Sequence, residues 1–238
     1  MCCYAANING DDPEDPVLFY NHEMRNILEN NLDSVRTLQK QGIRVQLSFF
    51  GNHQSAGWSA NMSQAACITL AEKMVDDINN FGLDGINIDD EYSMQEGNTQ
   101  SFYWVLQSIH GNSKFEGKKL TKALWSDSIY FSGGTNVASL LTEGYEMTYM
   151  GDVSLLDQYV QYGMDKSALL LGISPQFTAL SNVRSICDSV ISNAYAGVMI
   201  WAPNSFLSTE QAENYYSEII KARDGDGASV IYKSSFFK

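Results

Sequence analysis

Short apolar runs alternate with longer segments of helical period along most of this chain. Arg44–Phe50 is a compact run rich in strand-forming residues, and it follows a segment whose apolar side chains recur at helical spacing until Gly42. The run Gly85–Asp90 follows a second helical segment, which starts at Ser63 and stops at Gly82. Strand–helix alternation with short connections predicts a parallel sheet with crossover helices. Periodicity alone leaves a closed β/α barrel and an open doubly wound sheet equally possible.

The same pattern continues to the end of the chain and predicts seven strands. The first begins near Cys2, and the others are Arg44–Phe50, Gly85–Asp90, Leu120–Trp125, Tyr145–Tyr149, Ala168–Gly172 and Gly197–Trp201. A last helix is expected to open with a capping box formed by Ser208 and Gln211. No proline-rich or low-complexity stretch divides the chain, so we expect residues 1–238 to form a single domain.

Composition excludes several classes of partner. The chain has 28 acidic and 15 basic side chains, a net charge of −13, which disfavours nucleic acid and anionic membranes because phosphate binding requires clustered Lys and Arg. No apolar run reaches the roughly 18 residues of a transmembrane helix, and the start MCCYAANING lacks the basic and apolar regions of a signal peptide. The four cysteines are too few and scattered for a disulfide framework, and we expect all of them to be small buried residues: Cys2, Cys3, Cys67 and Cys187.

The segment FGLDGINIDDEY carries the most chemistry. Alternate side chains share one face of a strand, so Asn87, Asp89 and Glu91 point one way while Asp90 points the other. The Cα atoms of Asp89 and Glu91 would lie about 6–7 Å apart. Two carboxylates that close raise their joint proton affinity, so one of them can serve as a general acid near neutral pH. An inert acidic turn and, less readily, a Ca²⁺ or Mg²⁺ site remain alternatives.

Residues 84–91, DGINIDDE, resemble the DGxDxDxE signature of glycoside hydrolase family 18. The longer stretch LDGINIDDEY is similar to the branch of endo-β-N-acetylglucosaminidases typified by endoglycosidase H. Three further segments resemble that branch in the same order: AANIN at residues 5–9, LQKQGIRVQLS at 38–48 and GNHQSAG at 51–57. The similarity is dense from Ala5 to Tyr92 and thinner, although collinear, to about residue 222.

This resemblance implies a (β/α)8 barrel that hydrolyses the β-1,4 bond between the two core N-acetylglucosamines of an N-glycan. In this family the acetamido group of the substrate is the nucleophile. By resemblance, Glu91 would protonate the leaving oxygen, and Asp89 would orient and stabilise the acetamido group. No metal or other cofactor is implied. The expected partner is an N-glycan or glycoprotein, bound by a monomer in a secreted, periplasmic or cell-surface location.

One position departs from the family pattern, which has an aspartate where this chain has Asn87. An amide can donate a hydrogen bond to Asp89, but it cannot exchange a proton or carry charge. We therefore expect a shifted pH optimum or a lower rate. A non-catalytic glycan-binding relative and a chitinase are the alternatives to an endoglycosidase.

Other candidate residues lie at expected strand ends. Tyr149 ends Met147-Thr148-Tyr149, which resembles an element of the family whose tyrosine contacts the substrate acetamido group. Trp201 resembles the aromatic floor of the reactive subsite and suits the apolar face of a pyranose ring. Four polar residues of the GNHQ and AANIN segments are expected to line the same face and bind glycan: His53, Gln54, Asn7 and Asn9.

By the resemblance, AANIN corresponds to the second strand of the family's barrel. The first strand and helix of the barrel are therefore expected to be missing from these 238 residues. A barrel lacking one strand would leave unpaired edges. The prediction is thus an N-terminally truncated sequence, or a barrel with an open seam beside Cys2–Asn7.

Overall fold

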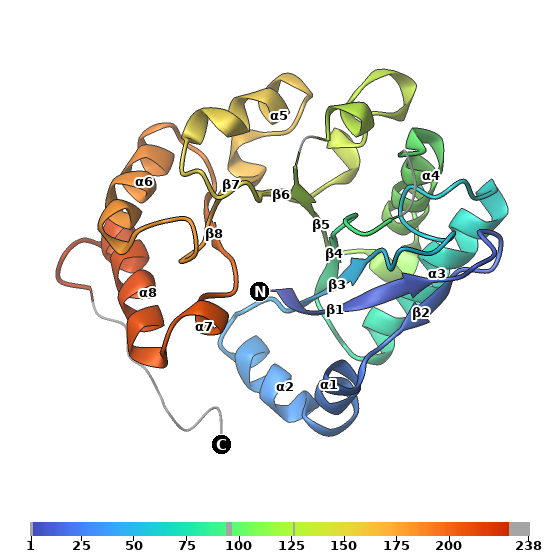
Figure 1. Ribbon diagram of the computed structural model, residues 1–238, viewed down its shortest axis with the longest axis horizontal. Coiled ribbons are helices and arrows are strands. Elements are labelled where there is room, and N and C mark those ends of the chain that lie inside the picture. The colour runs from blue at the N-terminus through green and yellow to red at the C-terminus, as the bar shows by residue number, and fades with distance from the viewer. Residues whose placement is uncertain (1, 94–96, 126, 229–238) are drawn as a thin grey trace. The chain divides into compact units, whose positions relative to one another are not determined.

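The structure is a computed structural model that describes residues 2–93, 97–125 and 127–228 (Figure 1). All seven predicted strands are present, and an eighth, β2, was not predicted. The strands are β1 (Cys2–Asn9), β2 (Val17–Phe19), β3 (Gln46–Phe50), β4 (Gly85–Ile88), β5 (Lys119–Leu124), β6 (Glu143–Glu146), β7 (Leu169–Ile173) and β8 (Gly197–Ile200). Four predicted strands end earlier than expected, because Asp89, Trp125, Tyr149 and Trp201 lie in the turns that follow them.

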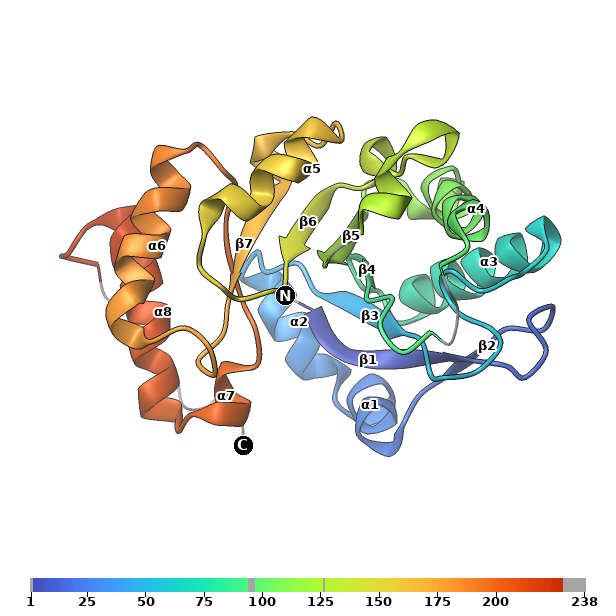
Figure 2. The same ribbon diagram turned by 45° about the horizontal axis from the view of Figure 1, so that its top comes forward.

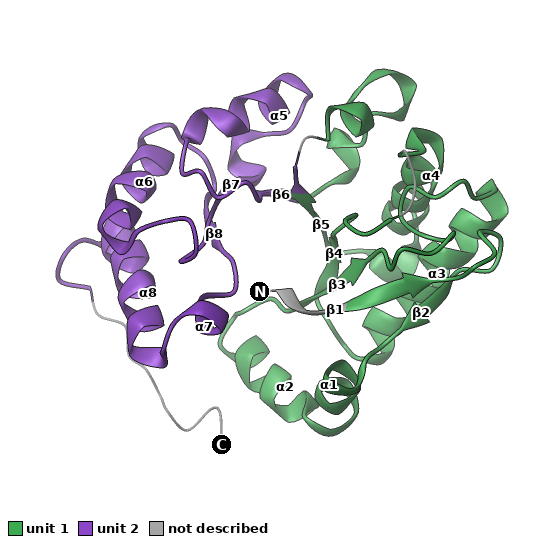
Figure 3. Cartoon of the chain, in the orientation of Figure 1, with its two compact units in different colours: residues 1–123, 127–142 green, residues 124–126, 143–238 purple. Residues whose placement is uncertain are grey.

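The chain divides into two compact units (Figure 3). Unit 1 comprises residues 1–123 and 127–142, and unit 2 comprises residues 124–126 and 143–238. The expectation of a single domain therefore stays a prediction.

Unit 1 is built on the strand order β2-β1-β3-β4-β5. Strands β1, β3, β4 and β5 are parallel, whereas β2 is antiparallel to the last three residues of β1. Ser48, Asn87 and Thr121 are opposite one another in register across β3, β4 and β5. Gly85 opens β4 where a Cβ would lie 2.2 Å from the carbonyl oxygen of Lys119, so any side chain there would push the two strands apart. This close pairing fixes the register of the strand that carries the acidic segment.

The helices of unit 1 follow the predicted pattern. They are α1 (His22–Arg25), the π-helical turn η1 (Asn26–Asn30), α2 (Leu32–Lys40), α3 (Gln64–Asn80) and α4 (Thr99–His110). Helix α3 begins as expected at Ser63, whose hydroxyl accepts the N–H of Ala66, and it ends before Gly82, which has a φ of 56°. Helices α3 and α4 pack side by side (Figures 1 and 2). Their apolar faces form a core with β3 and β4: Cys67, Leu70, Met74, Phe102, Val105, Leu47, Phe49, Ile86 and Ile88.

Unit 2 contains the parallel strands β6-β7-β8. Its helices are α5 (Asp157–Gln161), α6 (Leu180–Ser192), α7 (Pro203–Phe206) and α8 (Thr209–Asp224). The predicted capping box is confirmed, because the Ser208 hydroxyl accepts the backbone N–H of Gln211 and the Gln211 side chain accepts that of Ser208. Buried residues of β7, α6 and α8 pack into one cluster: Ile173, Val183, Cys187 and Tyr215.

Short 3₁₀ helices complete the connections: η2 (Ser113–Phe115), η3 (Ser128–Phe131), η4 (Gly133–Thr135), η5 (Ala138–Leu140), η6 (Val153–Leu156) and η7 (Lys166–Ala168). Cys67 and Cys187 are free and buried, as predicted, whereas the side chains of Cys2 and Cys3 lie outside the described part of the structure. Among the described helices, none combines the length and apolar character needed to cross a bilayer.

Candidate active site

Strand β4 delivers the two predicted carboxylates at its carboxyl end. All four residues of β4 are buried, and Asp89 follows directly, with its backbone N–H donated to the carbonyl of Phe49 at 3.2 Å. Burial, and next the charge of Glu91, raise the pKa of the Asp89 carboxyl from 3.8 to about 7. The pKa of Glu91 is also raised, first by burial and then by the charge of Asp90. The Asp89 carboxyl therefore keeps a proton in part near neutral pH, chiefly because it is buried, whereas the spacing argument attributed such a rise to the neighbouring carboxylate.

The backbone amide of Glu91 turns back toward Asp89. Its N–H lies 3.4 Å from Asp89 Oδ1, a long contact that partly opposes the upward shift of the Asp89 pKa. The turn that follows is tight, since Tyr92 has a φ of 63°, a left-handed conformation that is unusual for a bulky side chain. Strain of this kind persists only where neighbouring contacts enforce the turn.

Those contacts come from the loop after β3. The N–H of Gly51 donates to the carbonyl of Glu91 at 3.0 Å, and the N–H of His53 donates to the carbonyl of Tyr92 at 2.5 Å. A Cβ on Gly51 would lie 2.5 Å from the backbone nitrogen of Ser93, so only glycine fits there. The glycine and histidine of the GNHQ segment thus hold the turn that carries Glu91.

The predicted glycan-binding residues of unit 1 converge on this loop. Asn7 Nδ2 donates to the carbonyl of Gly51 at 3.2 Å, and Asn9 Oδ1 accepts from Asn52 Nδ2 at 2.8 Å. Gln54 Oε1 accepts the N–H of Gly10 at 2.6 Å. The exposed ring of His53 packs edge-on against Tyr92, with centroids 5.3 Å apart. These side chains tie the ends of β1 and β3 together, and their contact with a glycan stays a prediction.

The side chain of Asn87 forms its hydrogen bonds with residues of the neighbouring strands. Its Oδ1 accepts from the Ser48 hydroxyl at 2.7 Å, and its Nδ2 donates to Thr121 Oγ1 at 2.9 Å; Thr121 in turn donates to Gln46 Oε1 at 2.9 Å. Among the described residues, no hydrogen bond joins Asn87 to Asp89, so the donation that an amide could make to that carboxylate is not formed, and the expected effect on rate and pH optimum stays a prediction. The amide is held sideways, in a polar row across β3, β4 and β5, because its register partners are hydroxyl side chains.

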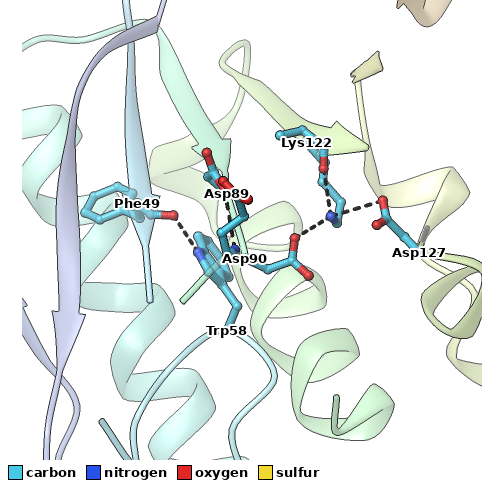
Figure 4. Close-up of polar contacts among 8 residues, drawn as sticks. Phe49, Trp58, Asp89, Asp90, Lys122 and Asp127 are labelled. Atoms are coloured by element: carbon cyan, nitrogen blue, oxygen red, sulfur yellow. Dashed lines mark hydrogen bonds and ion pairs between the residues drawn. The ribbon is translucent and has the colours of Figure 1, made fainter. Parts of the chain in front are cut away.

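Sequence reasoning missed a buried lysine beside the acidic segment. Lys122 on β5 is fully buried, and its Nζ contacts Asp90 Oδ1 at 2.6 Å and Asp127 Oδ2 at 3.2 Å (Figure 4). Burial opposes its charge, but the two carboxylates outweigh that effect and raise the pKa of the ammonium above its ordinary value. A lysine inside an otherwise apolar predicted strand, near an aspartate on the outer face of the next strand, was the available signal.

In unit 2, Tyr149 and Trp201 belong to a cluster of four aromatic rings. Tyr149 has a φ of 60°, and its ring stacks on Trp201 and Phe177 with centroids 5.7 Å and 6.1 Å apart. Phe206 lies 5.4 Å from Trp201. Phe177 and Trp201 are 63% and 43% exposed, although large aromatic side chains favour burial. Neither phenylalanine was predicted, since neither lies in a recognisable motif.

The site offers no cation-binding cage within the part of the chain described. No group of three or more His, Cys, Asp or Glu side chains there is arranged to hold a metal ion.

Comparison with solved structures defines the class as the β/α-barrel glycoside hydrolase fold. EndoBT-3987 of Bacteroides thetaiotamicron, solved with a Man5GlcNAc product, superposes with a TM-score of 0.69 at 20% identity, over 95% of this chain and 52% of that one. A fungal endo-β-N-acetylglucosaminidase of glycosyl hydrolase family 18 gives a TM-score of 0.69 at 16% identity, over 93% and 85% of the two chains. The chain thus spans about half of the first structure and most of the second. No family model matches the sequence.

Sequence comparison gives a closer relationship. An endo-β-N-acetylglucosaminidase of Flavobacterium sp. (strain SK1022) is 35% identical over 233 residues, which is 95% of this chain and 71% of the relative. The chain belongs to the endo-β-N-acetylglucosaminidases of glycoside hydrolase family 18. It is accordingly a glycoside hydrolase, as its resemblance to the endoglycosidase H branch implied.

Proposed function

We propose that this hydrolase cleaves the β-1,4 bond between the two core N-acetylglucosamines of N-glycans, with Glu91 as the general acid. The observation that carries the proposal is the carboxyl pair at the end of β4, in which burial raises the pKa of both groups, the charge of Glu91 adds to the rise at Asp89, and the charge of Asp90 adds to the rise at Glu91. The Man5GlcNAc product bound by EndoBT-3987 supports an N-glycan as the substrate class.

In the first step, the protonated Glu91 carboxyl gives its proton to the glycosidic oxygen as the bond from that oxygen to the anomeric carbon breaks. The carbonyl oxygen of the substrate's own acetamido group attacks the anomeric carbon from the opposite side, and an oxazolinium-like intermediate forms. The Glu91 carboxylate then removes a proton from water as the water opens this ring. The anomeric configuration is retained, and Glu91 regains its proton.

Asp89 is the group suited to orient the acetamido nitrogen. As the intermediate forms, that nitrogen becomes positively charged, and a carboxylate beside it stabilises the charge. A pKa of about 7 for Asp89 means that the free enzyme keeps this group largely neutral in mildly acidic solution. Asp89 stabilises the positive charge on the substrate only after it has lost its own proton to solvent, so the ionised fraction of Asp89 is the reactive one.

Asn87 acts as a neutral support beneath this pair. Its hydrogen bonds run to Ser48 and Thr121, and an amide has no titratable proton to transfer to Asp89. The rate and pH dependence of this enzyme then lack the contribution of the carboxylate that the family pattern has at position 87. The expected shift in pH optimum follows from that missing charge.

The remaining predicted residues are assigned to substrate binding. The Tyr149 hydroxyl is proposed to contact the acetamido group, and the exposed face of Trp201 to pack against the apolar side of the sugar ring. Four polar residues are proposed to contact the glycan around the loop after β3: Asn7, Asn9, His53 and Gln54. On the same resemblance, we expect a single monomeric domain that is secreted, periplasmic or at the cell surface.

Incubation with a high-mannose glycoprotein tests this proposal. Mass spectrometry should show each glycosylation site reduced to a single N-acetylglucosamine, and Glu91→Gln should lower the rate by about 10²–10⁴-fold. Chitin oligomers serve as the competing substrate. Preferential cleavage of chitin would reassign the substrate class, and glycan binding without release by well-folded wild-type protein across a broad pH range would indicate a lectin.

A further inference from the structure

We propose that Lys122 is a positioning residue, which holds the catalytic turn by binding Asp90, the residue between Asp89 and Glu91. The inference rests on the proposed function, because it concerns how those two carboxylates are held. Lys122 lies on β5, next to β4 in the sheet, and reaches the end of β4 from the side that faces α4.

The lysine is held on all sides. Its Nζ donates to Asp90 Oδ1 at 2.6 Å and to the carbonyl of Ala123 at 2.8 Å, and it forms an ion pair with Asp127 Oδ2 at 3.2 Å. The rings of Phe102 and Tyr130 each lie 5.8 Å from Nζ and present their faces to its charge. A fully buried ammonium with two hydrogen bonds and two carboxylate partners has little freedom to move.

Asp90 transmits that rigidity to the reacting groups. It lies between Asp89 and Glu91 in sequence, and its side chain reaches Lys122 (Figure 4). Two sets of contacts therefore hold the turn. Lys122 binds the Asp90 side chain. The N–H groups of Gly51 and His53 donate to the carbonyls of Glu91 and Tyr92. Displacing a reacting group by about 1 Å can cost on the order of 100-fold in rate.

Lys122 also acts on the charges of the pair. The pKa of both Asp89 and Glu91 is raised mainly by burial, raised further by Asp90, and lowered by Lys122. The backbone N–H of Glu91 adds to the lowering at Asp89, and the two catalytic carboxyls repel each other. Asp127 and Tyr130 face Lys122 from beyond β5, yet neither perturbs the pKa of Asp89 or Glu91. Asp90 and Lys122 thus have opposite effects on the pKa of both Asp89 and Glu91.

Asp90 and Asp127 give a matched comparison, because both are carboxylates on the same buried lysine and only Asp90 belongs to the catalytic turn. We expect Asp90→Asn to lower kcat by about 10- to 100-fold with KM changed less than about 3-fold, and Asp127→Asn to keep kcat within about 3-fold of wild type. Thermal unfolding of both variants measures any loss of stability alongside.

The pH profile separates positioning from mere structural support. Asp90→Asn removes a negative charge and should shift the pH profile of kcat to lower pH, whereas Lys122→Met removes a positive charge and should shift it to higher pH. Equal losses of kcat in Asp90→Asn and Asp127→Asn that follow their losses in Tm, with unchanged pH profiles, would overturn the proposal. If Lys122→Met does not fold, the comparison of the two aspartate variants still decides.

A readout without turnover keeps this test independent of the proposed function. Carboxyl NMR titration of Asp89 and Glu91 should show lower pKa values in Asp90→Asn than in wild type, and no change in Asp127→Asn. Unchanged values in Asp90→Asn would contradict the electrostatic part of the proposal. Wild-type protein that releases no glycan would instead reject the proposed function and leave the titration result standing.

Discussion

Replacing Asp89 by asparagine should stabilise the fold at alkaline pH while removing the charge that the reaction requires. The pKa of the Asp89 carboxyl rises from 3.8 to about 7, chiefly because the side chain is buried and next because Glu91 is close. At about 1.4 kcal/mol for each tenfold change in proton affinity, ionising Asp89 in the fold costs up to about 4 kcal/mol more than in the unfolded chain.

The sign of the pH dependence follows from which state binds more protons. Between the unfolded and folded pKa values the folded protein keeps a proton that the unfolded chain has lost. This contribution to stability is therefore fully present below about pH 4 and is lost as the pH rises through about 7. Asparagine has no proton to lose, and its Oδ1 can still accept the N–H of Glu91.

Urea unfolding followed by tryptophan fluorescence measures the effect. We expect Asp89→Asn to exceed wild type in free energy of unfolding by about 2–4 kcal/mol at about pH 8 and to match it at about pH 4. Asp11→Asn removes one charge at an exposed position and controls for net charge. A difference between Asp89→Asn and wild type that is the same at both pH values would refute the reasoning, because an uncharged effect of the substitution does not titrate.

Three further outcomes follow from the site. Asn87→Asp places a carboxylate between the Ser48 hydroxyl and Thr121, below Asp89. It should shift the pH–rate profile of glycan release to higher pH. An unchanged profile, or a shift to lower pH, would contradict this prediction. Phe177→Ala should raise KM for a glycopeptide by about 3- to 10-fold with kcat nearly unchanged, since the exposed ring is suited to uniform binding, and kinetics that show a loss confined to kcat would argue against it. Gly51→Ala should lower both Tm and kcat, because its Cβ would lie 2.5 Å from the Ser93 nitrogen; wild-type values in a melting curve and a rate assay would show that the turn can yield.

Features that depend on a single strand could be predicted from the sequence, whereas contacts between neighbouring strands could not. Period-two alternation singled out Asp89 and Glu91 as a pair, and their place on one face stays a prediction because β4 ends at Ile88. The partners of Asn87 could not be predicted, because they depend on the register of β3 and β5 against β4. The pairing of Lys122 with Asp90 depends on the same register. From the sequence alone, a single lysine in a mostly apolar strand is expected to face solvent.

The aromatic residues of unit 2 show a second limit. Tyr149 was expected to end a strand, but β6 stops at Glu146, and Tyr149 reaches Trp201 through a left-handed turn. Positive φ at a tyrosine has no signal in a single sequence. Phe177 joins the cluster through a loop after β7 whose path is set by tertiary packing, so motif reasoning could not include it.

The close approach of Gly51 to Ser93 has a consequence for how this enzyme can be diversified. The loop after β3 carries residues proposed to recognise the glycan, and the turn after β4 carries the acid, yet the two backbones meet with no space for a methyl group. A substitution in the glycan-binding loop at this point is therefore expected to affect catalysis as well as substrate preference. Libraries that randomise residues 51–57 alone should yield mostly inactive clones, whereas libraries that vary both segments together can sample new specificities with the acid still in place.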